Sequence, residues 1–366
     1  MSPTELNQLF KTYDTYVCLL SDHLLPNVIP AVQTKPQRAI LLYTPRSKDG
    51  VDRFKDVVAS TSVEVLGKQV NPYQYAQTQA ICEEILGEFP SAMLNVTAGT
   101  KIMALAAFDT FRQHRLPILY VDTDNQRIQY LHSGKSESLG DPLTVKQYLA
   151  CYGYTMQTIN HQYNLPQSWR NLEELLVTQS KPLHKALSQL NWIAAHQQKR
   201  FSLTSPELAD ALLKAGLIEA KHNASYQFTS EDAGRFINGG WFEHYIYSLL
   251  RQIQTQYPIK NLMANIKITN GHVSNELDIV FLYKNKLYII ECKTRHFTES
   301  GAVDSTSPIY KIDSLSKQVA GIKGKSMFAS YYPLTDAPKK RCRNNGIVCS
   351  DQPSQLLKHL RQWIGS

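Results

Sequence analysis

The chain has 366 residues, of which 43% are hydrophobic and 19% are charged, and its formal net charge is +8. This composition excludes a disordered or collagen-like chain and suggests two or three domains of ordinary size. The N-terminus lacks the pattern of a secretion signal, and no apolar run reaches the length of about 18 residues that a membrane span needs, so we expect a cytoplasmic protein without membrane contact.

The first 150 residues alternate strand and helix patterns. Strands are predicted at 14–21, 38–44, 62–67, 92–97, 117–123 and 126–132, and helices at 24–33, 52–60, 71–89 and 99–114. Repeated strand–helix units predict a mainly parallel sheet with helices on both faces, which is a Rossmann-like α/β domain.

Residues 151–239 differ because they are mostly helical. A helix at 205–219, a short apolar strand and a second helix within 225–239 resemble a winged-helix arrangement. Such a unit can bind DNA, but this region is almost neutral, so we interpret it as a connector or a dimer element.

A third unit begins with an amphipathic helix at 239–254. Further patterns predict a strand at 262–270, a hairpin at 275–295, a helix at 311–325 and a strand at 326–334. This order is typical of a mixed sheet flanked by helices. The expected domains are therefore 1–150, 151–239 and 240–366.

The positive charge is concentrated in this third unit. Residues 241–366 hold 17 Lys and Arg against 9 Asp and Glu, whereas residues 1–150 hold 14 against 15. A basic surface attracts polyanions, so the C-terminal unit is the part expected to meet nucleic acid, and its cluster KKRCR at 339–343 is a candidate phosphate contact. The alternative for both features is an ordinary solvated surface.

Six cysteines occur without any CxxC pair, which predicts free thiols. A Cys342–Cys349 disulfide or half of a metal site is the alternative.

The hairpin, NELDIVFLYKNKLYIIECKTR, reads as two apolar strands joined by a polar turn. Side chains alternate between the faces of a strand, so Glu291 and Lys293 share one face and Cys292 points the other way. Asp278 on the first strand can converge with this pair. Two carboxylates can hold Mg²⁺ or Mn²⁺, and the lysine can orient water or neutralise charge on a phosphate. The alternative is a surface salt bridge on an edge strand, worth about 0–1 kcal/mol.

Asp278 followed by Glu291-Cys292-Lys293 resembles the D…ExK core of the PD-(D/E)xK nuclease superfamily. The resemblance implies a restriction-endonuclease-like α/β domain and a metal-dependent phosphodiester hydrolase. It also implies that Glu243, on the preceding helix, completes a metal shell with Asp278 and Glu291.

Other residues around this motif are weaker candidates. Gln318 and its neighbour Lys317 lie on the following helix, where many such nucleases keep a polar assisting residue, and we include Gln318 among the catalytic candidates. His244 and His296 adjoin the motif and have a structural alternative. Glu276 shares a face with Asp278 and is interpreted as a neighbour of the site rather than a ligand.

A second polar segment, NVTAGTK at 95–101, ends a strand and opens a helix. Backbone N–H groups at a helix N-terminus favour phosphate, and ligands of open α/β sheets bind beyond the carboxyl ends of the strands. The candidate ligand-binding residues here are Thr97, Ala98, Gly99, Thr100 and Lys101, joined at the same edge by Ser21, Asp22, His23 and Thr44. A well-capped helix with an incidental lysine is the alternative.

An N-terminal α/β domain carrying VTAGTK resembles the CRISPR-associated Rossmann fold (CARF) sensors. The order of sensor, winged-helix-like connector and nuclease resembles the single-CARF ancillary nucleases of type III CRISPR systems. The resemblance implies a homodimer activated by cyclic tetra-adenylate that cleaves DNA, by nicking, or single-stranded RNA in antiviral defence.

Two other classes of function compete with this interpretation. One is a ligand-responsive winged-helix DNA-binding regulator with an inactive nuclease-like domain, and the intact set of Asp278, Glu291 and Lys293 counts against it. The other is a nucleotide-dependent oxidoreductase, which is disfavoured because the chain has no GxGxxG fingerprint.

Overall fold

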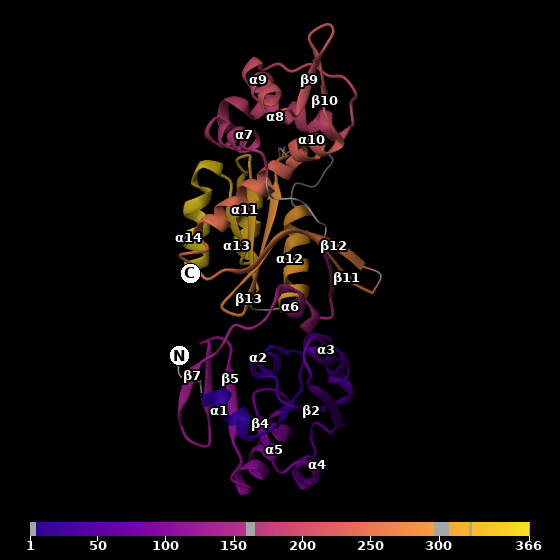
Figure 1. The fold of residues 1–366 in the computed structure, drawn as a ribbon, viewed down its shortest axis with the longest axis vertical. Helices are drawn as coiled ribbons and strands as arrows, with labels where there is room; N and C mark the ends of the chain where they lie inside the picture. Colours follow the sequence, from indigo (N-terminus) through magenta and orange to yellow (C-terminus); the bar gives the residue numbers. More distant parts are fainter. Residues whose placement is uncertain (1–4, 159–164, 272, 296–306, 322–323, 366) are drawn as a thin grey trace. The chain divides into compact units, whose positions relative to one another are not determined.

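A computed structural model describes residues 5–158, 165–271, 273–295, 307–321 and 324–365. The chain divides into two compact units, Met1–Thr155 and Met156–Ser366 (Figure 1). Apart from residues 151–155, which belong to the first unit, the connector and nuclease regions that the sequence predicts both fall within the second unit. Their separation into two domains stays a prediction. Within the described residues, no helix has both the length and the apolar character needed to cross a lipid bilayer.

The first unit is built on a seven-stranded sheet with the order β3-β2-β1-β4-β5-β6-β7. Its strands are β1 (Thr15–Leu19), β2 (Arg38–Tyr43), β3 (Glu64–Gln69), β4 (Ala92–Asn95), β5 (Ile118–Asp122), β6 (Arg127–Tyr130) and β7 (Ser136–Ser138). Strands β1 to β5 pair in parallel, and β6 and β7 add antiparallel edge strands. The mainly parallel sheet that the sequence predicts is thus confirmed.

Helices cover both faces of this sheet. They are α1 (Glu5–Thr12), α2 (Leu25–Thr34), α3 (Asp49–Val58), α4 (Tyr75–Glu88), α5 (Lys101–Gln113) and α6 (Val145–Cys151). Figure 1 shows α2 and α3 on one side of the unit and α4 and α5 on the other. Val17 and Leu19 of β1 pack with α4 and α5 in one buried cluster, whereas the ring of Tyr16 contacts the ring of Phe10 in α1. The alternation of side chains along β1 therefore supplies both cores.

The second unit holds a six-stranded mixed sheet with the order β15-β14-β13-β12-β11-β8. Its strands are β8 (Thr155–Thr158), β11 (Lys260–Asn270), β12 (Val273–Tyr283), β13 (Lys286–Lys293), β14 (Lys325–Ser330) and β15 (Val348–Ser350). Strands β11, β12 and β13 pair antiparallel, and β13, β14 and β15 pair in parallel. The predicted hairpin is confirmed as β12 and β13, and its two turn residues, Lys284 and Asn285, have φ of 51° and 55°, as a type I′ turn requires.

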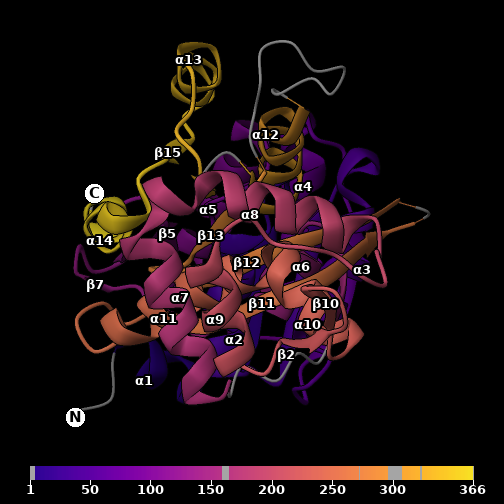
Figure 2. The same cartoon turned by 90° about the horizontal axis from the view of Figure 1, so that it is seen from above.

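Helices make up most of the rest of the described second unit. They are α7 (Gln167–Thr178), α8 (Ser180–Ala195), α9 (Pro206–Lys214), α10 (Glu231–Arg235), α11 (Trp241–Ile253), α12 (Ser307–Ala320), α13 (Asp336–Asn344) and α14 (Leu356–Gly365). Helices α7 to α10 group with the two-stranded sheet of β9 (Ile218–Lys221) and β10 (Ser225–Phe228) (Figure 1), and Figure 2 shows these helices from above. Buried residues of α7 and α8 share one hydrophobic cluster with α11, β12 and β13.

Several elements were not predicted from the sequence patterns. They are α1, β7, α6, β8, α13, β15 and α14, which are short or lie near the ends of the units. The predicted strand 326–334 was too long, because pairing stops at Ser330 and Tyr331 and Tyr332 turn into the buried cluster. The predicted helix at 71–89 began too early, because α4 begins at Tyr75 and the Asn71 side chain accepts a hydrogen bond from the Tyr73 N–H before the helix.

Candidate active site

The predicted acids meet where β12 and β13 separate. Pairing between these strands runs from Tyr283↔Lys286 to Ile279↔Ile290. Continuing that register places Asp278 opposite Glu291, but the Cys292 N–H donates to Asp278 Oδ2 at 2.7 Å. A side-chain carboxylate therefore replaces a backbone partner at the end of the ladder, and this opens the sheet at the site.

Lys293 bridges the two carboxylates. Its Nζ lies 2.5 Å from Glu291 Oε1 and 3.6 Å from Asp278 Oδ2, and it also donates to the Cys292 carbonyl at 3.0 Å. The side chain of Glu291 is 4% exposed and that of Asp278 is 13% exposed, so neither forms the surface salt bridge of the alternative interpretation. The convergence that strand alternation predicts is present, and Cys292 lies in the hydrophobic cluster on the opposite face.

Burial and mutual repulsion act on the acids. Burial, and then the charge of Asp278, raise the pKa of Glu291, although Lys293 opposes both effects. Burial by itself would lower the pKa of Lys293, but Asp278 and Glu291 together raise it, so the ammonium stays charged. Such a cluster of carboxylates in a dry environment, held beside one cation, is typical of a catalytic or ion-binding site.

Glu243 approaches from the first turn of α11. Burial, followed by the charge of Asp278, raises the pKa of Glu243 to about 8, and a hydrogen bond with Asn265 and the charge of Lys293 oppose this rise. The charge of Glu276 also raises the pKa of Glu243. Glu276 is itself exposed, which agrees with its interpretation as a neighbour of the site.

Asn265 was missed by the sequence reasoning. It lies in β11 with φ of 51°, and the pairs Ala264↔Ile279 and Ile266↔Leu277 place it opposite Asp278. A left-handed asparagine inside a strand is uncommon and turns its amide toward Glu243. The one available signal was a polar residue within the apolar run LMANIKI.

The start of α11 is held against the end of β13 by an irregular backbone. Residues Phe236–Gly240 form a π-helical turn, and Gly239 has φ of 128°. A Cβ on Gly239 would lie 3.3 Å from Thr294 Oγ1, so both its backbone conformation and the close approach favour glycine. This junction sets the position of Glu243 relative to the strand that carries Glu291 and Lys293.

The connector helices brace the same strand ends. Asn191 of α8 donates from Nδ2 to the Thr294 carbonyl at 2.7 Å. Tyr331 and Tyr332, which follow β14, donate from their hydroxyls to the carbonyls of Leu176 and His184. His244, beside Glu243, lies 2.6 Å from the buried Glu173 of α7, which gives this candidate residue a structural role.

Asn191→Ala is expected to lower the free energy of unfolding by about 1–2 kcal/mol, because the Thr294 carbonyl loses its buried donor. It should also slow cleavage, because the end of β13 loses an anchor. Urea unfolding and a cleavage assay check both effects. Gln189→Ala removes a half-buried amide of the same helix whose hydrogen bond to the Ser202 carbonyl is exposed, and it serves as the control. Equal behaviour of the two variants would contradict the bracing role.

Helix α12 contributes differently from the sequence prediction. Gln318 is exposed and donates to Ser314 Oγ at 3.3 Å, and Lys317 pairs with Asp313 at 2.8 Å. The sequence reasoning missed Lys311, whose positive charge acts to lower the pKa of Glu291. Lys311 and Gln318 are seven residues apart and share one side of the helix. The catalytic assignment of Gln318 stays a prediction, and His296 lies outside the described residues.

The donor chemistry of the site fits a hard divalent cation. Asp278 and Glu291 supply oxygen ligands, and a bound cation would offset the burial and the charge of Asp278 that raise the pKa of Glu243. In the described part of the chain, however, no three His, Cys, Asp or Glu side chains are already gathered around one point. Asp278 and Glu291 both contact Lys293 and therefore lie close together. These two strand acids form the core of the candidate metal site.

The second candidate site lies at the carboxyl edge of the first sheet. The chain leaves β1 toward β2 and later returns to β4 on the other side of β1, which makes the ends of β1 and β4 the switch point of the sheet. Asn95, at the end of β4, donates to Tyr16, Pro26 and Asn27 and is fully buried. This network fixes the loop that follows.

The residues of NVTAGTK have distinct positions. Thr97 donates to Asn95 and accepts from the Val121 N–H, and Thr100 caps α5 and donates to the Pro72 carbonyl. Gly99 has φ of 79°, and a Cβ there would lie 3.0 Å from Leu19, so glycine is required. Ala98 is half-buried, whereas Gly99 and Lys101 are exposed and accessible to a ligand.

The loops after β1 and β2 reach the same edge. Ser21 accepts from the His23 N–H, and Thr44 is buried by its capping box with Ser47. Asp22 pairs with Arg46 at 2.8 Å, and both side chains are exposed. Arg46 is a second cation at this edge and was missed, because the sequence pattern gives no reason to separate it from other surface arginines.

Comparisons with known proteins cover the whole chain. Residues 15–148 match the family model of the Card1 CARF domain, and residues 230–366 match that of the Card1-like endonuclease domain. The structure of Can2 from Sulfobacillus thermosulfidooxidans in complex with cyclic tetra-adenylate is 62% identical, with a TM-score of 0.87, covering 99% of this chain and 100% of that one. Among curated proteins, no relative matches the chain significantly.

Two more distant structures share the fold. Protein VC1899 from Vibrio cholerae is 23% identical, with a TM-score of 0.83, over 96% of this chain and 98% of that one. A type III CRISPR defence DNA nuclease activated by cyclic oligoadenylate is 17% identical, with a TM-score of 0.61, over 95% of this chain and 51% of that one.

A parallel α/β unit joined to a mixed sheet with a D…ExK site defines a protein that couples a sensor to an endonuclease. The identity to Can2 along the full length shows the family. The chain belongs to the single-CARF ancillary nucleases of type III CRISPR systems. The resemblance predicted from the sequence is confirmed.

Proposed function

We propose that this chain is a cyclic-tetra-adenylate-activated, metal-dependent endonuclease that works as a homodimer on DNA, on single-stranded RNA, or on both. The observation that carries the proposal is the buried cluster of Asp278, Glu291 and Lys293 at the point where two strands separate. The activator is proposed from the 62% identical Can2, whose structure contains that ligand.

In this proposal, Asp278 and Glu291 hold Mg²⁺ or Mn²⁺, and Glu243 completes the shell. The bound ion would supply Lewis acidity toward a phosphoryl oxygen and a water of lowered pKa. Lys293 keeps its proton and neutralises charge that develops on the phosphate, and the low exposure of the site strengthens this interaction. Asn265 holds Glu243 by hydrogen bonding in the absence of an ion.

One assay tests the proposed activity. Purified protein is incubated with Mn²⁺, plasmid DNA and labelled single-stranded RNA, with and without each cyclic oligoadenylate. We expect cleavage that depends on both the metal and cyclic tetra-adenylate. Specific duplex binding without cleavage under any of these conditions would instead favour the regulator.

The sensor pocket is proposed to form from Lys101, the backbone of Ala98 and Gly99, and the loops that carry Ser21, Asp22, His23 and Thr44. Thr97 and Thr100 shape the loop through their internal bonds and keep free acceptor capacity. In a homodimer, two such edges would bind one two-fold ligand. Activation then requires that the ligand bind more tightly to the dimer state in which the nuclease sites are competent.

Lys101→Ala is expected to weaken binding of cyclic tetra-adenylate by about tenfold or more, because a charge-assisted contact with phosphate is lost. Isothermal titration calorimetry measures the affinity. Lys11→Ala removes the same charge from the end of α1, which precedes β1, and should leave the affinity unchanged. Equal affinities of the Lys101→Ala variant and the unaltered protein would place the ligand elsewhere.

A further inference from the structure

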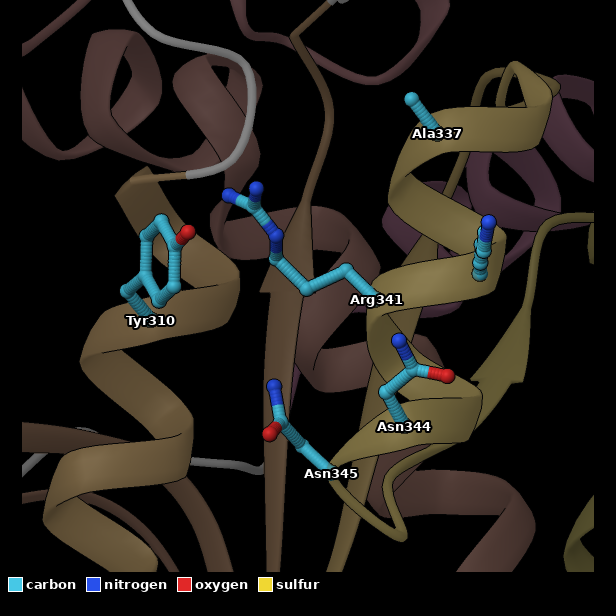
Figure 3. Close-up of a pocket in the computed structure, with 6 residues that line it drawn as sticks. Tyr310, Ala337, Arg341, Asn344 and Asn345 are labelled. Atoms are coloured by element: carbon cyan, nitrogen blue, oxygen red, sulfur yellow. The ribbon is translucent and has the colours of Figure 1, made fainter.

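A hollow of about 430 Å³ lies between α12 and α13, outside the acid–lysine cluster. Its lining residues are Tyr310, Ala337, Lys340, Arg341, Asn344 and Asn345. Figure 3 shows Arg341 reaching from α13 toward Tyr310 on α12, with Asn344 and Asn345 on the next turn. The lining combines an aromatic ring, two cations and two amides, and its volume lies within the range of about 300–1,000 Å³ that is typical of small-ligand sites.

Arg341 is placed to donate hydrogen bonds to a ligand in the hollow. Its Cζ lies 3.9 Å from the centroid of the Tyr310 ring, a cation–π contact that holds the guanidinium over one face. Its Nη1 is buried and has no hydrogen-bond partner among the residues that the structure describes. A buried guanidinium nitrogen without an acceptor is costly, so an acceptor such as a phosphate oxygen would be stabilising there.

Among the described residues, the cations of the hollow have no ion-pair partner. On the same helix, Lys339 pairs with Asp351 at 2.8 Å. Lys340 and Arg341 make no ion pair with any described residue, and Lys340 is exposed. The cluster KKRCR therefore divides into the structural Lys339, the two cations Lys340 and Arg341 that line the hollow, and the exposed Arg343, which does not line it. The sequence could not distinguish these roles.

Tyr310 offers an aromatic surface on the helix that packs beside the strand of Glu291. The residue is 50% exposed, so part of its ring is accessible. The charge of the next residue, Lys311, acts to lower the pKa of Glu291. Helix α12, which carries both residues, packs on β13 and β14. A strand of nucleic acid bound at Glu291 could therefore extend along α12 to Tyr310.

We propose that this hollow binds one nucleotide of a single-stranded substrate. Its phosphate would contact Lys340 and Arg341, its base would stack on Tyr310, and the amides of Asn344 and Asn345 would reach the base edge. Every base has a stackable face, whereas bases inside a duplex are already stacked, so the site favours single strands. This inference rests on the proposed nuclease function and adds how its substrate is held.

The test measures binding without cleavage. Fluorescein-labelled 12-mers of single-stranded DNA, single-stranded RNA and duplex DNA are titrated by fluorescence anisotropy in EDTA, with and without cyclic tetra-adenylate. Tyr310→Leu should weaken single-strand binding by about 5- to 30-fold, because base stacking is lost. Tyr310→Phe keeps the aromatic ring and should bind single strands as the unaltered protein does. Loss in one of the two single-strand arms only would assign the site to that nucleic acid.

The cations are tested on the same helix. Arg341→Gln should weaken binding and lower the slope of log affinity against log salt by about 0.7, whereas Arg343→Gln, the matched exposed arginine, should leave the affinity within about twofold. Lys340→Gln repeats the test at an exposed position where folding is not at risk.

Equal affinities of Tyr310→Leu and Tyr310→Phe would overturn the inference, and so would an equal loss on duplex DNA. Absence of oligonucleotide binding by the unaltered protein in every arm would overturn it too. Failure of the proposed function appears separately, as absence of cleavage by the unaltered protein with Mn²⁺ and activator.

Discussion

Lys293→Met is expected to lower the rate of nucleic-acid cleavage by about 10³-fold or more, with little change in the affinity for cyclic tetra-adenylate. The reason is that Lys293 is held between Asp278 and Glu291, with its Nζ 3.6 Å from Asp278 Oδ2 and 2.5 Å from Glu291 Oε1. Removing it deletes the charge that would oppose the developing charge on the phosphate. The loss is measured in single-turnover cleavage assays with saturating Mn²⁺ and activator.

Stability has to be separated from catalysis in this test, because removing one partner of a buried pair leaves the other uncompensated. Glu291→Gln in the Lys293→Met background removes that charge and should recover stability without recovering cleavage. Lys286→Met, at the other end of the same strand, is the matched control and should remain active. Full cleavage by the Lys293→Met variant would contradict the assignment of the active site.

Glu243→Gln is expected to stabilise the metal-free protein at alkaline pH. Burial and Asp278 raise the pKa of Glu243 from about 4.5 to about 8 in the folded state. Below pH 4.5 the group is protonated in both states. Between the two pKa values the folded state binds more protons, so the free energy of unfolding falls as pH rises. The glutamine variant escapes this loss and should be more stable by ~2–4 kcal/mol at pH 9.

Chemical denaturation at pH 5 and pH 9 measures this difference. The two proteins should be close in stability at pH 5 and diverge by pH 9. Glu207→Gln changes an exposed glutamate in the first turn of α9 and should show no such divergence. Mg²⁺ should reduce the advantage of Glu243→Gln, because a bound cation stabilises the native carboxylate. A pH-independent difference would contradict the burial of a charged Glu243.

The strands and the acid cluster were predictable because both depend on short-range rules. Apolar runs and a polar turn at Lys284 and Asn285 define the hairpin, and alternation places Glu291 and Lys293 on one face. The same rules located the loop after β4, because a strand that ends before a glycine and a helix cap reaches the carboxyl edge of a parallel sheet.

Residues that act through distant neighbours could not be predicted in this way. Asn265, Lys311 and Asn191 look like ordinary polar residues in the sequence, and each gains its role from a strand or helix far along the chain. Thr97 and Thr100 show the reverse, because hydroxyls that looked available to a ligand hold the loop together.

By itself, the sequence determined two α/β units, the acid–lysine motif and the placement of excess positive charge in the last third of the chain, because periodicity and charge are local properties. Only the tertiary structure decided which polar groups are buried together. The separation of β12 from β13 made Lys293 the bridge between two acids, and the packing of α12 beside α13 turned part of a basic run into a hollow lined by Tyr310 and Arg341. These relations depend on desolvation and on contacts between segments remote in the chain, which no pattern of neighbouring residues encodes.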